Sequence, residues 1–151
     1  MTGGGTVRRI DIATARPLRV TVLRAGMPGD PAIFAGDDEP ETVHFGAFAG
    51  DSLVGVVTAM HHQRPGAGPE EWQLRGMATL PEVRGEGHGA ALIAAAEAFI
   101  AEQGGTSIWF NARRAAEGFY ARMRYTTVSD EFDVPGIGPH VVMEKIGRAH
   151  V

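Results

Sequence analysis

The stretch that decides the fold is MATLPEVRGEGHGAALIAAAEAFI, from Met77 to Ile100. Its Gly-rich centre, Arg84 to Gly89, is followed by a run of strong helix formers. The pattern predicts a strand over Glu71–Leu80 with a bulge near Gly76, then a turn, then a helix over Ala90–Gln103. A Gly-rich connection therefore joins an expected strand to an expected long helix.

This Gly-rich segment has the chemistry of a phosphate-binding loop. Small residues allow successive backbone N–H groups to point into one concavity, and the first turn of the following helix adds unpaired N–H groups. A pyrophosphate suits such a site, and Arg84 offers a charge-assisted contact. A turn without a ligand is the alternative. The segment lacks the Gly-Lys-Ser/Thr ending of a Walker A loop and is one residue shorter than the GxGxxG fingerprint.

A second candidate pair is Asn111 and Tyr120. Asn111 is expected to end a buried strand over Thr106–Phe110, and Tyr120 is expected inside a helix over Arg113–Arg124. Ligands of open α/β sheets bind where strands end beside helix starts. A phenol can protonate a leaving group whose pKa is thiol-like, about 8.5. The alternative is a core tyrosine with a paired hydroxyl and an asparagine that caps a helix.

The rest of the chain supplies further strands around these two segments. They are expected over Val7–Ile12, Val43–Ala49, Leu53–His61, Tyr125–Val128 and Val141–Ile146. Because strands outnumber helices and do not alternate regularly with them, the order predicts one sheet of mixed α/β or α+β type. It does not predict a Rossmann alternation.

The connections between these strands are less regular. A helix capped by Thr14 is expected to run to Arg24, although its apolar residues also alternate as in a strand. Loops rich in Pro and Gly are expected over Gly26–Glu41 and Val134–His140.

Length and composition limit the classes of function. The 151 residues fit one domain, expected over 7–147 after a disordered tail over 1–6. The absence of cysteine excludes disulfides, thiolate metal sites and a cysteine nucleophile, and the pair His61-His62 lacks a second ligand pair, so no metal site is expected. A net charge of −4 predicts no binding of nucleic acid. Without a secretory signal or an apolar run of about 18 residues, a cytoplasmic protein without a membrane partner is expected.

Two segments together resemble the GNAT superfamily of acyl-CoA-dependent N-acetyltransferases: MATLPEVRGEGHGAALI (Met77 to Ile93) and IWFNARRAAEGFYARMRY (Ile108 to Tyr125). The family's phosphate-binding pattern, Arg/Gln-x-x-Gly-x-Gly/Ala, is matched by Arg84, Gly87 and Gly89. Its Asn…Ala…Tyr pattern is matched by Asn111, Ala116 and Tyr120. The segment FDVPGIGPHVVMEK (Phe132 to Lys145) is similar to a bacterial subgroup with unassigned substrates.

The resemblance implies a fold, a cosubstrate and a set of site residues. The fold is one mixed, mostly antiparallel sheet of about six to seven strands flanked by helices, in which the fourth and fifth strands splay apart. Acetyl-CoA is the implied cosubstrate, and Tyr120 is the implied acid that protonates the departing CoA thiolate. The implied cofactor-binding residues are Met77, Ala78, Thr79, Arg84, Gly85, Glu86, Gly87, His88, Gly89, Asn111, Ala116 and Phe119.

The expected function is therefore acetyl transfer from acetyl-CoA to a primary amine by direct attack. Transfer of another acyl group and a non-catalytic acyl-CoA-binding or regulatory module are the alternatives. The acceptor, a small-molecule or peptide amine, is not identified, because the family's usual second helix after the first strand has no counterpart in Met27–Glu41. A homodimer through C-terminal edge strands is an open option.

The base that takes the amine proton is also open at this point. Its candidates are Glu70, Glu71, His61, His62 and His140. Among them His140 has a side chain that titrates near neutral pH and follows a Pro/Gly-rich stretch. The basic pair Arg113-Arg114 is expected on a solvated face, with a contact to CoA phosphates as the alternative.

Overall fold

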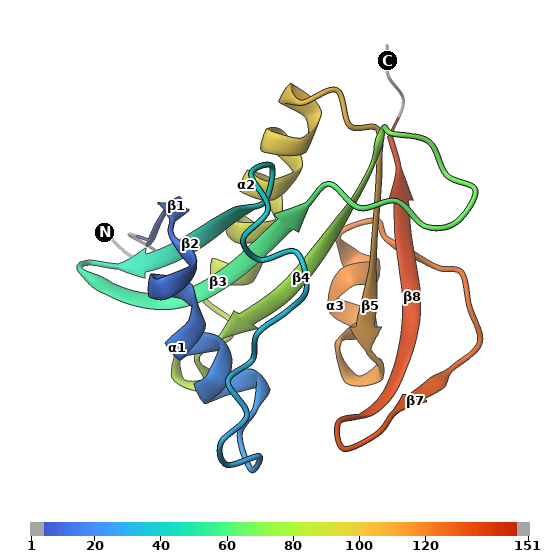
Figure 1. The fold of residues 1–151 in the computed structure, drawn as a ribbon. Coiled ribbons are helices and arrows are strands. Elements are labelled where there is room, and N and C mark those ends of the chain that lie inside the picture. The colour runs from blue at the N-terminus through green and yellow to red at the C-terminus, as the bar shows by residue number, and fades with distance from the viewer. Residues whose placement is uncertain (1–4, 148–151) are drawn as a thin grey trace.

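Four antiparallel strands form the first half of the sheet in the computed structural model, which describes residues 5–147 (Figure 1). In sheet order they are β1 (Gly5–Ile10), β2 (Val43–Ala49), β3 (Ser52–Met60) and β4 (Glu71–Thr79). The predicted hairpin between β2 and β3 is confirmed. Its turn begins at Gly50, whose φ of +61° lies in the left-handed region that glycine tolerates.

The second half of the sheet is joined to the first by a short parallel contact. β4 pairs with β5 (Ser107–Arg113) only from Glu71 to Gln73, and beyond this point the two strands diverge (Figure 1). β5 pairs antiparallel with β8 (Gly138–Ile146), and β8 also pairs with the short strands β6 (Thr126–Thr127) and β7 (Phe132–Val134). The mixed, mostly antiparallel sheet is confirmed, with eight strands.

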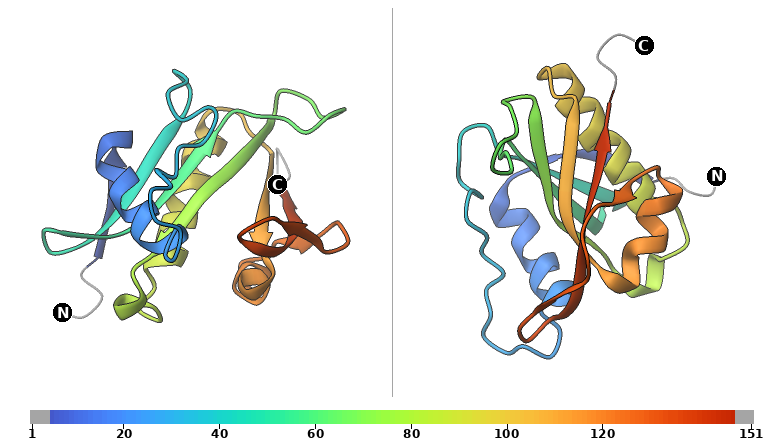
Figure 2. Two further views of the ribbon diagram at one scale, coloured as in Figure 1. Left: turned by 60° about the horizontal axis from the view of Figure 1, so that its bottom comes forward. Right: turned by 90° about the vertical axis from the view of Figure 1, so that its right-hand side faces the viewer.

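Helices cover both faces of the sheet, as the right-hand view of Figure 2 shows. α1 (Ile12–Leu23) lies on one face, and α2 (His88–Glu102) and α3 (Glu117–Arg122) lie on the other. Short 3-10 turns, η1 (Pro81–Val83) and η2 (Arg114–Ala116), precede α2 and α3. Of the helices in residues 5–147, none is long and apolar enough to cross a membrane.

The larger hydrophobic core lies between the sheet and α2. The α2 residues Leu92, Ile93, Ala96 and Ile100 are fully or almost fully buried there. Burial of these side chains contributes roughly 1.5–3 kcal/mol for each large aliphatic group. This core fixes where α2 begins, and therefore where the Gly-rich loop before it lies.

The N-terminal elements differ from the prediction at their ends. β1 begins at Gly5, so the expected tail is wrong at residues 5–6, while residues 1–4 lie outside the described residues. α1 is a helix, but its cap is Asp11 rather than Thr14, because the Asp11 carboxylate accepts a hydrogen bond from the Thr14 N–H at 2.8 Å. Ile12 accordingly belongs to the helix and not to the strand.

The structure differs more from the prediction in the C-terminal third of the chain. β5 does not end at Asn111 but continues to Arg113, because β8 offers it partners along its whole length. The expected helix over Arg113–Arg124 is divided into η2 and α3. The expected loop over Val134–His140 is the tip of the β7–β8 hairpin. β8 has partners on both sides, so the short strands β6 and β7, and not β8, lie at this edge of the sheet.

Candidate active site

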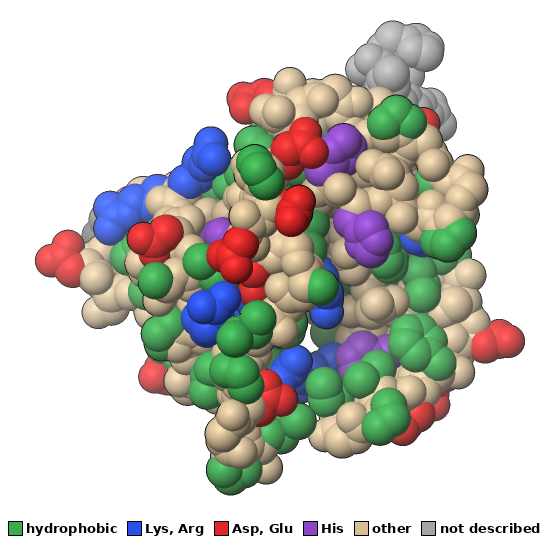
Figure 3. Space-filling view, viewed as in Figure 1, with side chains coloured by type: hydrophobic (Ala, Val, Ile, Leu, Met, Phe, Trp, Pro, Cys, Tyr) green, Lys and Arg blue, Asp and Glu red, His purple; other side chains and the backbone are tan. Residues whose placement is uncertain are grey.

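A cavity of about 280 Å³ opens where β4 and β5 diverge. It passes between the two faces of the sheet. The lining residues on the side of α2 and α3 include Met77, Ile93, Ala116 and Tyr120. Those on the side of α1 include Leu23, Arg24, Phe34, Arg113 and His140. Figure 3 shows a hollow near the middle of the molecule, with Lys, Arg and His side chains around its lower part.

A bulge in β4 shapes one wall of this cavity and confirms the prediction near Gly76. Between Val56 and Thr58 of β3, the register of β4 slips by one residue. Gly76 has a φ of +63°, and a Cβ at this position would lie 2.8 Å from Arg19 Nε, so only glycine fits without a shift. The bulge turns Met77 toward α2 and leaves an extra backbone unit of β4 at the cavity.

The Gly-rich loop lies at the start of α2 and presents open backbone. Gly85 and Gly87 have φ values of +89° and +90°, and a Cβ built on either would meet nothing within 4 Å. Among the residues that the structure describes, none accepts a hydrogen bond from the N–H groups of Gly85, Gly87 or the first three residues of α2. Free N–H groups at a helix N-terminus suit an anion.

Other residues of the loop hold it against the cavity. A Cβ on Gly89 would lie 3.0 Å from Met77 Cε and 3.1 Å from Phe119 Cζ, so the loop packs closely against these two side chains. The exposed Arg84 donates a hydrogen bond to the Thr79 carbonyl at 3.3 Å. Close by, the buried imidazole of His88 packs in the fold, with Nε2 3.5 Å from the Glu86 carboxylate.

Tyr120 lines the same cavity from α3. Its ring is 7% exposed and packs on Phe110, with the ring centroids 4.4 Å apart. No residue between 5 and 147 forms a hydrogen bond with its hydroxyl, unlike the paired hydroxyl expected for a core tyrosine. Burial raises the pKa of Tyr120, so the phenol keeps its proton at neutral pH.

Other predicted residues are near this phenol, but they do not all present their side chains to it. Asn111 and Ala116 line the cavity, and Phe119 packs edge-on against the Tyr120 ring. Ala78 is the exception, because its side chain is buried on the α1 face of the sheet. Only its backbone is available on the cavity side of β4.

Comparison with known proteins decides the family. Residues 18–125 match the family model described as the acetyltransferase (GNAT) family. The chain belongs to the GNAT family of acetyltransferases. It is therefore an acyltransferase, and its fold is the GNAT acyltransferase fold.

Relatives and solved structures agree with this assignment. The GNAT chain is 32% identical over 143 residues to "Uncharacterized N-acetyltransferase YitI" of Bacillus subtilis (strain 168), covering 94% of this chain and 96% of YitI. It is similar in fold to an acyl-CoA N-acyltransferase from Pseudomonas aeruginosa, with a TM-score of 0.72 and 17% identity over 93% of this chain and 97% of that one. An aminoglycoside 6'-N-acetyltransferase complexed with coenzyme A is also similar, with a TM-score of 0.68 and 18% identity over 93% and 96%.

Of the five candidate bases in the GNAT chain, only His140 lines the cavity. Its Nδ1–H donates to the Gly138 carbonyl at 2.9 Å, which leaves Nε2 of the neutral ring as an acceptor. His61 instead forms hydrogen bonds with the Pro69 carbonyl and the Glu41 carboxylate, and these two contacts raise the pKa of His61. His62 bonds the Gln73 side chain.

The two glutamates are not placed to act as the base either. Glu70 is exposed and does not line the cavity. Glu71 is buried and accepts hydrogen bonds from Arg64 and Ser107, at 2.7 and 2.9 Å for the Arg64 Nη2 and Ser107 Oγ donors. The Arg64 guanidinium lowers the Glu71 pKa to about 2, so this carboxylate is a weak base. Its role is to join β4, β5 and the loop before β4.

This lowered pKa predicts an acid-dependent loss of stability. A carboxylate whose pKa is lower when folded stabilises the protein above its ordinary value of 4.5, and that contribution disappears as the pH falls toward about 2. We expect the free energy of unfolding to fall with pH in both wild type and Glu71→Gln, but by about 1–2 kcal/mol more in wild type between pH values of about 4.5 and 2. This difference allows for solvent screening at the partly exposed Arg64. Urea unfolding at a series of pH values measures it, with Glu70→Gln as the control. Parallel pH curves would contradict the assignment.

The wall of the cavity on the α1 side was not predicted from the sequence. Arg24, Phe34 and Arg75 line it from α1, the following loop and β4, and Arg113 lies there rather than on a solvated face. Nothing in the sequence marks these residues as a group, because they come from four separate segments. Among the residues that the structure describes, no group of three or more His, Asp or Glu side chains is placed to hold a metal.

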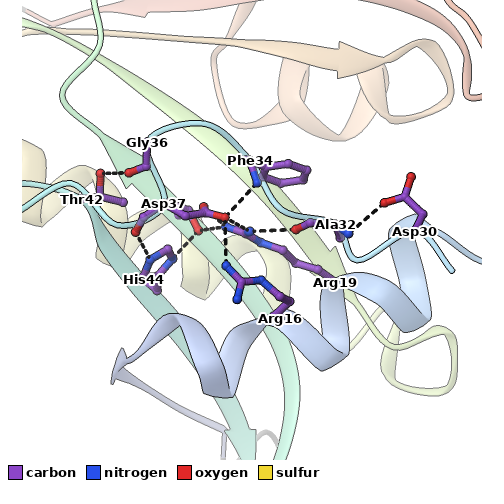
Figure 4. Close-up of polar contacts among 10 residues, drawn as sticks. Arg16, Arg19, Asp30, Ala32, Phe34, Gly36, Asp37, Thr42 and His44 are labelled. Atoms are coloured by element: carbon purple, nitrogen blue, oxygen red, sulfur yellow. Dashed lines mark hydrogen bonds and ion pairs between the residues drawn. The ribbon is translucent and has the colours of Figure 1, made fainter.

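Phe34 reaches the cavity because a buried ion pair fixes the long loop (Figure 4). Arg19 is fully buried and donates to both carboxylate oxygens of Asp37, at 2.8 and 2.9 Å, and to Thr58 Oγ1 at 2.7 Å. Asp37 also accepts a hydrogen bond from the Phe34 N–H at 2.9 Å. Although burial opposes it, hydrogen bonding to Arg19 and Phe34 lowers the Asp37 pKa. The ion pair thus positions the aromatic ring beside the cavity.

Proposed function

We propose that this GNAT protein transfers an acetyl group from acetyl-CoA to a primary amine by direct attack. The observation that carries the proposal is a cavity with an unpaired tyrosine hydroxyl in its wall, next to an open phosphate-type loop whose Gly89 packs against Met77 of the cavity wall. A thioester whose phosphates bound to this loop would have its leaving group near a proton donor.

The cosubstrate is assigned to residues on the α2 side of the sheet. The free N–H groups of Gly85 and of Gly87–Ala90 would bind the pyrophosphate, with Arg84 adding charge. The backbone of Met77–Thr79 would pair with the pantetheine arm, and Asn111, Ala116 and Phe119 would lie along it. The similar aminoglycoside 6'-N-acetyltransferase complexed with coenzyme A supports this choice of cosubstrate.

The proposed reaction has one chemical step. The amine nitrogen attacks the thioester carbonyl carbon, the C–N bond forms, and the C–S bond breaks as CoA leaves as a thiolate. Tyr120 donates its phenolic proton to that sulfur, and His140 Nε2 takes a proton from the amine, directly or through water. A backbone N–H at the β4 bulge would stabilise the oxyanion. The chain has no cysteine, so no thioester intermediate on cysteine can form.

Release of free thiol distinguishes this function from its alternatives. Acetyl-CoA is mixed with the protein and a panel of primary amines, and thiol is measured over time. Amine-dependent thiol release supports acetyl transfer, and release only from a longer acyl-CoA would indicate a different acyl group. Binding of acetyl-CoA without release for any amine would indicate a non-catalytic module. The unpaired Tyr120 hydroxyl favours transfer, since a binding module has no need of it.

The loop assignment predicts that Gly87→Ala weakens acetyl-CoA binding. Gly87 has a φ of +90° and its missing Cβ faces open space, where we place the pyrophosphate. Loss of one charge-assisted hydrogen bond, about 1.5–3 kcal/mol, should raise the Kd at least tenfold. Gly104→Ala is the matched control, because Gly104 has a φ of +85°, faces open space and lies beyond the other end of α2. Calorimetry should show loss of affinity for Gly87→Ala alone, and equal affinities would contradict the loop assignment.

A further inference from the structure

Three guanidinium groups line the α1 side of the cavity. They belong to Arg24, Arg75 and Arg113. The Phe34 ring lies among them, with the Arg75 guanidinium carbon 4.5 Å from its centroid and that of Arg24 at 5.6 Å. Stacking on an aromatic face leaves the N–H edge of a guanidinium free for another partner.

These positive charges are only partly balanced within the protein. Arg24 Nε lies 3.3 Å from the Asp30 carboxylate. In the described part of the chain, the Arg75 guanidinium has no hydrogen bond or ion pair, and the Arg113 guanidinium donates only to the Leu23 carbonyl, at 2.9 Å. Two guanidinium groups at the cavity therefore lack a carboxylate partner.

The nearby Asp37 carboxylate is not a partner for the Arg75 or Arg113 guanidinium. Both of its oxygens are bonded to Arg19, and Arg16 approaches one of them at 3.5 Å. Burial lowers the pKa of Arg75, and neighbouring Arg19 and Arg24 lower it further against the attraction of Asp37. The pKa of Arg113 is lowered by burial first and then by Arg24. Half-buried cations without a partner cost free energy that a bound anion would offset.

The phosphates assigned to CoA do not account for this cluster. The Gly-rich loop lies at the start of α2, on the opposite face of the sheet from α1 and the loop that carries Phe34. The protein as a whole has a net charge of −4, so the cluster is not part of a generally basic surface. An anion bound by these arginines would therefore be separate from the phosphates of CoA.

We infer that the acceptor amine carries an oxyanion, a carboxylate or a phosphate, which Arg75 and Arg113 bind with help from Arg24. This inference rests on the proposed function, since it names the class of the acceptor for that reaction. The anion would lie on the α1 side, and its amine would point toward His140 and the gap between β4 and β5. Neutral amines and polyamines would lack the group that orients them.

Calorimetry with acetylated product analogues tests the inference without requiring turnover. The probes are N-acetylglycine, N-acetylleucine and N-acetylphosphoethanolamine, and the carboxamides of the first two are the neutral controls. Titrations are made with and without CoA. We expect at least one anionic probe to bind wild type roughly tenfold more tightly than a neutral control. The preferred probe tells a carboxylate acceptor from a phosphate acceptor.

Variants locate the preference in the cavity. Arg75→Gln and Arg113→Gln should each remove it, whereas Arg8→Gln should keep it, because Arg8 is exposed on β1 at the far edge of the sheet. Equal binding of anionic and neutral probes, no binding of any anionic probe, or a preference that survives both cavity variants would overturn the inference.

A separate acetyl-CoA titration reports on the proposed function. Normal acetyl-CoA binding without anion preference would overturn the inference alone. Anion preference without acetyl-CoA binding would overturn the proposed function, and with it the role of the bound anion as an acceptor, but not the anion site itself.

Discussion

Replacement of Tyr120 by phenylalanine is expected to lower kcat by about 100-fold or more and to leave acetyl-CoA affinity nearly unchanged. The hydroxyl forms no hydrogen bond within the described residues, so its removal breaks no contact of the fold. The phenyl ring would still pack on Phe110 and Phe119. What is lost is the proton donor for the leaving thiolate, which matters only in the chemical step.

Tyr125→Phe is the matched control for this prediction. Tyr125 is as buried as Tyr120, but it does not line the cavity, and its hydroxyl donates to Glu97 at 2.8 Å. Its loss should cost about 1 kcal/mol of stability and leave kcat unchanged. Single-turnover thiol release with both variants measures the chemical step directly. An undiminished rate in Tyr120→Phe would remove this phenol from the mechanism.

Replacement of Arg19 by methionine should destabilise the protein by about 3–5 kcal/mol. The substitution leaves the buried Asp37 carboxylate without its two-point partner, and the partly exposed Arg16 at 3.5 Å is no substitute. The loop that carries Phe34 would lose the contact that fixes it (Figure 4). Substrate binding on the α1 side of the cavity should therefore weaken together with stability.

Two further variants compare the contribution of the buried Arg19–Asp37 pair to stability with that of an exposed ion pair. Arg114→Met removes an exposed partner of Glu117 and should change stability by no more than about 0.5 kcal/mol. The double variant Arg19→Met with Asp37→Leu should recover part of the loss, because it leaves no buried charge. Denaturant unfolding of the three variants measures these differences. A loss below about 1 kcal/mol for Arg19→Met would contradict the role given to the pair.

Features with a local signal could be predicted from the sequence. The glycines between β4 and α2, the helix formers of α2 and the strand-forming residues on either side of the Gly50 turn are signals that lie close together in the chain. The bulge at Gly76 was also predicted. Each of these features is determined within about ten residues of sequence, or by a recognisable motif.

Features that depend on tertiary contacts could not be predicted in this way. β7 has only three residues and directly precedes the turn Pro135–Ile137, so it has no strand signal of its own in the sequence. It forms because it pairs with β8. The end of β5 was misplaced at Asn111 because the pairing with β8 continues to Arg113. The arginine cluster and Phe34 come from segments far apart in the chain, so only the folded protein brings them together. The acceptor side of the site was therefore the part that sequence reasoning left open.

Binding of acetyl-CoA by the loop before α2 and the cavity beside it is the property on which the proposed function depends. Calorimetric titration of the purified protein with acetyl-CoA tests it most directly, with adenosine as a control that lacks the pyrophosphate and the thioester arm. We expect a micromolar Kd for acetyl-CoA and no measurable binding of adenosine. Absence of acetyl-CoA binding, or equal binding of adenosine, would contradict this expectation.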